Sequence, residues 1–111
     1  MSEATVVEDR QASRFELLMD GEAAGFATYR RSGTAISFLH TEIDERFEGR
    51  GLGSVLVRGA LDAARAEGAA VLPFCPFVRR YISRHREYLD LVPADQRDRF
   101  QLPAEDEGGA G

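Results

Sequence analysis

A change in hydrophobic period divides the chain at residues 48–54, which read EGRGLGS. Before this segment apolar residues alternate with polar ones, as in a half-buried strand. After it they recur three and four residues apart, as in an amphipathic helix. Gly49, Gly51 and Gly53 omit three side chains where that helix should begin. The pattern therefore predicts strands that lead through a glycine turn into a helix, and so a protein with both kinds of element.

The part of the chain before the glycine turn predicts three strands. The turn dipeptides Asp20-Gly21 and Ser32-Gly33 separate three runs with strand character, which are 14–19, 23–31 and 35–43. Strands joined by such short turns pair antiparallel, so we expect a meander.

The part after the glycine turn predicts a helix over about 51–67 and then a short apolar strand. That strand, AAVLPFC, covers residues 69–75, and further helices are expected over 78–85 and 86–92. The predicted fold class is mixed α/β, in the order β-β-β-α-β-α. At 111 residues there is room for one core, which we place in a single domain over 1–93. Residues 94–111 are expected to form an acidic, flexible tail.

The charges are segregated along the chain, although the net charge is only −5. Residues 1–45 and 87–111 each carry −5, whereas residues 46–86 hold eight arginines against three acids and carry +5. A short basic segment between acidic ends favours a small anionic ligand over nucleic acid. We expect no membrane span, because no apolar run approaches the roughly 20 residues required. A monomer or weak homodimer is expected.

The single cysteine, Cys75, and the acidic N-terminus without a signal-peptide pattern predict a cytoplasmic protein. No Cys/His group has the spacing of metal ligands, so no metal is predicted.

A glycine-rich turn at a helix start can hold phosphate. The first turn of a helix has several N–H groups without intrahelical partners, and the helix dipole favours an anion there. Gly-x-Gly-x-Gly alone fits a plain capping loop about as well. It lacks the spacing of the dinucleotide fingerprint and the Lys-Ser/Thr ending of a nucleotidase phosphate loop.

In its wider context the segment resembles the acyl-coenzyme A signature of the GNAT superfamily of N-acetyltransferases, Q/R-x-x-G-x-G/A. Glu48, Gly51 and Gly53 fall on that pattern in order. The chain is most similar to the small single-domain group described as YjdJ-type. The similar stretches lie within residues 13–93 and read RFELLMDGE, LHTEID, RFEGRGLGSVLV and LPFCPFVRRYISRHREYLDLVP.

The resemblance implies a splayed sheet that holds acetyl-coenzyme A between strands 35–43 and 69–75. The pyrophosphate would rest on backbone N–H groups from Arg50 to Ser54. The implied cofactor-binding residues are Ile43, Arg46, Glu48, Gly49, Arg50, Gly51, Leu52, Gly53, Ser54, Arg80 and Arg84. Glu48 departs from the family pattern, which has Gln or Arg at this position. The short chain also implies a shallow acceptor site.

Acetyl transfer to an amine needs a base, and two candidates lie on strand 35–43. His40 and Glu42 have the same parity, so an ideal strand would direct both to one face, although a bulge would change which side chain faces the cleft. In GNAT enzymes a carboxylate on this strand often acts as the base, which favours Glu42, whereas the ordinary pKa of histidine favours His40. Alternatively, His40 makes a structural hydrogen bond and Glu42 is a solvated charge.

Three other residues are candidates near the thioester sulfur. Cys75 could accept the acetyl group or protonate the departing thiolate, or it could be buried and inert. Tyr81 approximates the tyrosine that protonates the thiolate in many GNAT enzymes, and His85 could assist or simply pack.

The predicted function is transfer of an acetyl group from acetyl-coenzyme A to a primary amine of a small molecule or peptide. We expect direct attack, with His40 or Glu42 as base. The acidic flanks suit a cationic acceptor, such as a polyamine or basic peptide. The alternatives are a non-catalytic acyl-coenzyme A-binding or protein-interaction module and a purely structural domain.

Overall fold

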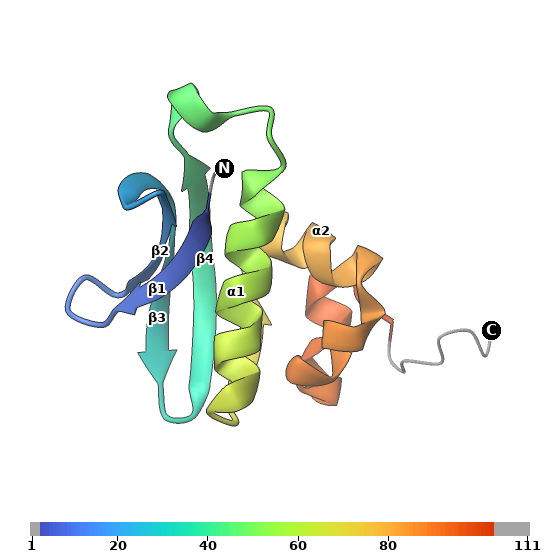
Figure 1. The fold of residues 1–111 in the computed structure, drawn as a ribbon. Helices are drawn as coiled ribbons and strands as arrows, with labels where there is room; N and C mark the ends of the chain where they lie inside the picture. Colours follow the sequence, from blue (N-terminus) through green and yellow to red (C-terminus); the bar gives the residue numbers. More distant parts are fainter. Residues whose placement is uncertain (1–2, 104–111) are drawn as a thin grey trace.

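The computed structural model describes residues 3–103 as a five-stranded sheet with two α-helices and a C-terminal segment of short turns (Figure 1). The sheet follows chain order, β1-β2-β3-β4-β5. Its strands are β1 (Ala4–Asp9), β2 (Arg14–Met19), β3 (Glu22–Ser32), β4 (Ala35–Ile43) and β5 (Ala70–Pro73). The first four pair antiparallel, and β5 pairs parallel to β4. The mixed α/β class predicted from the sequence is confirmed.

The meander has four strands, one more than the sequence predicts. β1 was missed because its residues, ATVVED, lie in an acidic segment and only part of the strand becomes buried. It pairs along its whole length with β2. Val6 of β1 also meets α1, because a Cβ built at Gly59 would lie 2.7 Å from the Val6 Cβ.

Helix α1 (Leu52–Ala66) packs on one face of the sheet, and Figure 1 shows it running alongside β4. Its buried side includes Leu56, Ala60 and Leu61, which repeat at helical spacing. They meet the inward side chains of β2 to β5, such as Phe15 and Phe38. The prediction of a helix over about 51–67 is confirmed to within a residue at each end.

The opposite face of the sheet, called here the open face, carries residues that are partly or fully exposed. In β2 and β3 the register places Glu16 opposite Phe26 and Arg14 opposite Thr28. All four side chains are at least partly exposed. The single layer of helices thus leaves one side of the sheet available to solvent.

Strand β4 contains a bulge that changes which side chains point to which face. Thr28 pairs with His40, whereas Tyr29 pairs with Phe38, so Leu39 is an extra residue on β4. Ile36 and Phe38 face the core before the bulge. Beyond it the parity reverses.

The sheet splays at the same point. Pairing of β4 with β5 ends at Phe38 and Pro73, while β4 continues to Ile43. The backbone N–H of Cys75 then donates to the Phe38 carbonyl at 2.8 Å, and α2 (Pro76–Arg84) begins. β5 is shorter than the predicted strand 69–75 because Cys75 already serves as the N-cap of α2.

The packed part of the chain continues past the predicted boundary at residue 93. The 3-10 turns η2 (Arg86–Leu91), η3 (Ala94–Gln96) and η4 (Asp98–Phe100) follow α2. Phe100 and Leu102 are buried in the core, and the Phe100 ring meets Phe74 edge-on. Residues 94–103 therefore belong to the packed domain, while the rest of the predicted tail lies outside the described residues.

Candidate functional site

The turn before α1 leaves backbone N–H groups directed away from the helix. Gly49 and Gly51 have φ angles of 82° and 72°, a left-handed conformation that costs other residues about 1–2 kcal/mol. Gly51 is the N-cap and makes no side-chain capping bond. Over residues 3–103, the backbone N–H groups from Arg50 to Ser54 donate to no other protein group. These N–H groups can bind an anion.

A pocket, called here the turn pocket, runs from this turn to β4. It contains every predicted cofactor residue of the turn except Arg50. Its lining residues are Thr41, Ile43, Phe47, Glu48, Gly49, Gly51, Leu52, Gly53, Ser54 and Phe77. The structure thus brings these predicted residues together at one pocket, with Thr41, Phe47 and Phe77, which the sequence did not single out.

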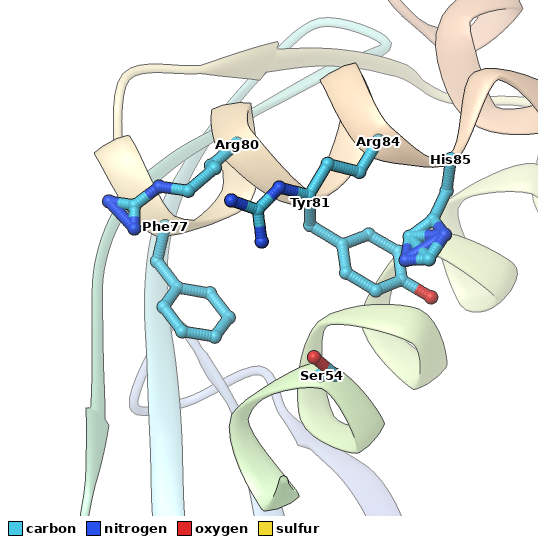
Figure 2. Close-up of a pocket in the computed structure, with 6 residues that line it drawn as sticks. All are labelled: Ser54, Phe77, Arg80, Tyr81, Arg84 and His85. Atoms are coloured by element: carbon cyan, nitrogen blue, oxygen red, sulfur yellow. The ribbon is translucent and has the colours of Figure 1, made fainter.

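A second pocket, the arginine pocket, lies between α1 and α2 (Figure 2). Phe77, Tyr81 and Arg84 extend from α2 towards the first turn of α1, where Ser54 lies. Ser54 and Phe77 line both pockets, so the two pockets adjoin, and together they are called here the groove.

The arginine pocket is cationic. Arg80 and Arg84 both line it, and neither guanidinium forms an ion pair within the described residues 3–103. Guanidinium groups without ion pairs are suited to bind phosphate, so the prediction that these two residues contact the cofactor is compatible with their position and stays a prediction.

The other two predicted arginines are placed differently. The Arg46 guanidinium donates to Glu22 at 2.7 Å and to Asp44 at 3.1 Å. The hydrogen bond from Arg46 lowers the pKa of Asp44, and Asp44 and Glu22 raise the pKa of Arg46. Arg46 is therefore already paired. The Arg50 guanidinium lies 5.4 Å from the centre of the Phe47 ring, and Arg50 is not among the residues that line the turn pocket.

Cys75 is buried beside Thr41 and lines neither pocket of the groove. The residue is 3% exposed, and its Sγ lies 3.3 Å from the Thr41 hydroxyl oxygen. Thr41 lines the turn pocket, and the bulge at Leu39 is what turns it towards this side. The strand pattern alone could not identify Thr41, because an unbulged strand would direct it to the open face.

His40 and Glu42 share one face of β4, as their parity predicts. The His40 Nε2 lies 3.1 Å from the Glu42 carboxylate. Their face is the open face, because the bulge directs them away from Thr41 and the groove. Both side chains are well exposed, 59% and 60% respectively. The two candidate bases therefore form a pair on one face, while Cys75 lies on the other.

Tyr81 lies in the arginine pocket beside Ser54, away from the Thr41 end of the groove. Its ring centre is 4.0 Å from that of His85, and burial raises the pKa of its hydroxyl. Of the two predicted thiolate acids, only Cys75 contacts a residue of the turn pocket at the β4 end.

Comparisons with known proteins agree with the sequence resemblance. A family model described as GCN5-related N-acetyl-transferase matches residues 14–91. The solution NMR structure of a GCN5-like protein from Staphylococcus aureus matches with a TM-score of 0.64 and 19% identity over 100% of both chains. No curated protein matches the sequence. Of the helices within residues 3–103, none has the length and hydropathy to cross a membrane.

Proposed function

The chain belongs to the GCN5-related N-acetyltransferase family, and from this premise we propose that it transfers an acetyl group from acetyl-coenzyme A to a primary amine. Membership of this family supports an acyltransferase activity of the chain in general terms. The observation that supports this cofactor is the groove, in which backbone N–H groups without protein partners lie near two arginines without ion pairs among residues 3–103. Its lining also includes Thr41, which contacts the buried Cys75 thiol.

The groove has the chemistry to hold coenzyme A. The N–H groups from Arg50 to Ser54 would hold the pyrophosphate, since the positive-φ glycines bring the backbone close and no capping side chain competes. Arg80 and Arg84 would contact the outer phosphate. Glu48 also lines the turn pocket, so its carboxylate must turn towards solvent to avoid the anion.

The β4 end of the groove would receive the thioester. Acetyl-coenzyme A supplies an activated acyl group there. Cys75 would lie near the sulfur and provide the proton that the departing thiolate needs, with Thr41 orienting the thiol through their 3.3 Å contact. Thr41 is thus a positioning residue in this proposal.

His40 and Glu42 would act together on the amine. An alkylammonium has a pKa near 10.4, so its deprotonation at pH 7 costs about 4–5 kcal/mol. When His40 is neutral and donates its Nε2 proton to Glu42, Nδ1 is left free to accept a proton from the amine. The amine would approach from the open face, where β5 no longer pairs with β4 beyond Phe38.

A non-catalytic acyl-coenzyme A-binding module is the second candidate. The observation that favours it is the exposure of His40 and Glu42, because a base usually acts within a closed site.

Acetyl transfer to a panel of amines tests the proposal. We expect turnover that His40→Ala and Cys75→Ala reduce at least about tenfold, with coenzyme A affinity retained. Coenzyme A binding by calorimetry without turnover on any amine would instead support the binding module. No binding of coenzyme A would exclude both.

A further inference from the structure

A hollow beside α2 lies next to the arginine pocket, and we call it the α2 hollow. Its volume is about 330 Å³, and residues of α2 line it together with Phe100, Gln101 and Leu102. Arg80 lines both the α2 hollow and the arginine pocket. A group that binds in the α2 hollow would therefore contact a residue of the proposed coenzyme A site.

The α2 hollow is cationic and has no counter-ion among residues 3–103. Arg79 and Arg80 line it, and no carboxylate of that range does. Neither guanidinium forms an ion pair or hydrogen bond within the same range. By contrast, Arg31, Arg46 and Arg65 each pair with a carboxylate. Two guanidinium groups that line one hollow repel each other, so an anion bound to both would be stabilised.

The backbone is anchored at the rim of the α2 hollow just before residue 104. Leu102 is buried, and its backbone N–H donates to the Arg97 carbonyl at 2.9 Å. Gln101 has a φ angle of 59°, a left-handed conformation that a residue other than glycine adopts only where its surroundings hold it. The position from which the chain continues is therefore fixed beside Arg79 and Arg80.

The residues that follow this anchor supply three carboxylates. Residues 104–107 read AEDE and are called here the acidic segment. Glu105 lies three residues beyond Leu102 and Glu107 five, so the chain can span up to about 10 Å and 17 Å respectively. All three acids can therefore reach a hollow that Leu102 itself lines. A short tether also gives these carboxylates a high local concentration at the hollow.

We propose that the acidic segment binds Arg79 and Arg80 in the α2 hollow and competes with the phosphate groups of coenzyme A for Arg80. Binding of the segment is independent of the proposed function, whereas the competition rests on it. The segment supplies the counter-ions that the hollow lacks. It thereby lowers the affinity of the groove for coenzyme A, and bound coenzyme A displaces the segment from Arg80.

The first test detects the contact in the full chain without any cofactor. A neutral variant carries Glu105→Gln, Asp106→Asn and Glu107→Gln, and NMR records the Nε–H signals of Arg79 and Arg80. We expect these signals to differ between the wild type and the neutral variant at low salt. The difference should largely disappear at about 0.5 M NaCl, which screens exposed ion pairs.

Two controls separate this contact from a general effect of charge. The charge-retaining variant Glu105→Asp/Asp106→Glu/Glu107→Asp should keep the wild-type signals of both arginines. Arg30 lies on β3 and does not line the hollow, so its Nε–H signal should be the same in all three proteins.

Calorimetry with coenzyme A tests the competition. We expect the neutral variant to bind coenzyme A about three- to fivefold more tightly than the wild type at low salt, the size expected for a few exposed ion pairs. The charge-retaining variant should bind as the wild type does. In a chain that carries Arg79→Gln, the same neutralisation should give a smaller gain, because one partner of the segment is removed. A gain of equal size with and without Arg79→Gln would overturn the proposal.

Each remaining outcome is also decisive. Identical Arg79 and Arg80 signals in the wild type and the neutral variant would overturn the proposal. Signals that change with protein concentration would show that the acidic segment of a second copy fills the hollow, and would likewise overturn it. Equal coenzyme A affinity despite the contact would overturn the competition. If coenzyme A binds none of these proteins, the proposed function fails, and the NMR comparison alone decides whether the segment occupies the hollow.

Discussion

Replacing Gly53 with alanine should separate coenzyme A binding from folding. A Cβ at this position would lie 2.6 Å from the Phe77 Cζ and 3.2 Å from Cε2. Carbon atoms in good contact lie about 3.5–4.0 Å apart, so the ring must move by about 1 Å. Phe77 is 37% exposed and can move, but it lines both pockets of the groove. Its displacement should therefore change the groove more than the core.

The expected change in stability is small because two effects oppose each other. Alanine is favoured over glycine in a helix by about 1 kcal/mol. Overpacking costs about 1–3 kcal/mol in a well-packed core, and the cost should be near the lower end for a half-exposed ring. We expect the free energy of unfolding of Gly53→Ala to change by less than about 1 kcal/mol, while coenzyme A affinity falls about tenfold.

Gly59→Ala is the matched control on the same helix. Its Cβ would lie 2.7 Å from the Cβ of Val6, an atom fixed to the backbone of β1. The strand cannot yield as a ring can, so we expect a net loss of about 1–2 kcal/mol of stability with coenzyme A affinity unchanged. Urea denaturation and calorimetry measure the two quantities. Wild-type affinity in Gly53→Ala would refute the role of Phe77 in the groove, and wild-type stability in Gly59→Ala would refute the packing argument.

Three further outcomes are expected. Thr41→Val should change the rate of Cys75 alkylation in the absence of any substrate, because it removes the hydroxyl 3.3 Å from the thiol, and Thr41→Ser should restore the rate. Identical rates for all three proteins would contradict the positioning role. Arg84→Gln should lower the affinity for coenzyme A, and make it less dependent on salt, while the affinity for dephospho-coenzyme A stays unchanged. Calorimetry measures both affinities, and an equal loss for the two ligands would show that the outer phosphate binds elsewhere. The hydrogen bond from Arg31 lowers the pKa of Glu67, so this pair stabilises the fold above the ordinary carboxyl pKa of about 4.5 and loses that contribution as pH falls through the lowered value. Denaturation from pH 7 to pH 3 should therefore show a smaller loss of stability in Glu67→Gln than in the wild type, and equal losses would contradict the linkage.

The elements that the sequence predicted well are those with a long regular pattern. The strand over 35–43 and the helix over about 51–67 appear with nearly the expected bounds, since each buries one face for most of its length. β1 lacks such a pattern, because it is an edge strand whose pairing with β2 is visible only in three dimensions. The burial of Phe100 likewise depends on its contact with Phe74, which the local sequence pattern does not predict.

The backbone geometry of the candidate site was easier to predict from the sequence than the directions of its side chains. Glycines at positions needing positive φ identify the turn before α1 directly, as at Gly49 and Gly51. The direction of a side chain depends on its partners. Arg46 is basic and adjacent to the turn, yet Glu22 on a different strand pairs with it. Such competition between partners can be recognised only in the tertiary structure.

The bulge at Leu39 has the largest effect on the site. Without it, His40 and Glu42 would continue the inward series of Ile36 and Phe38, and Thr41 would point to the open face. Two charged groups would then lie on the helix-covered side at the cost of burying them. The extra residue instead places a hydroxyl beside Cys75 and the charged pair in solvent. In the proposed reaction, β4 would thereby present Thr41 to the thioester on one face and His40 to the amine on the other.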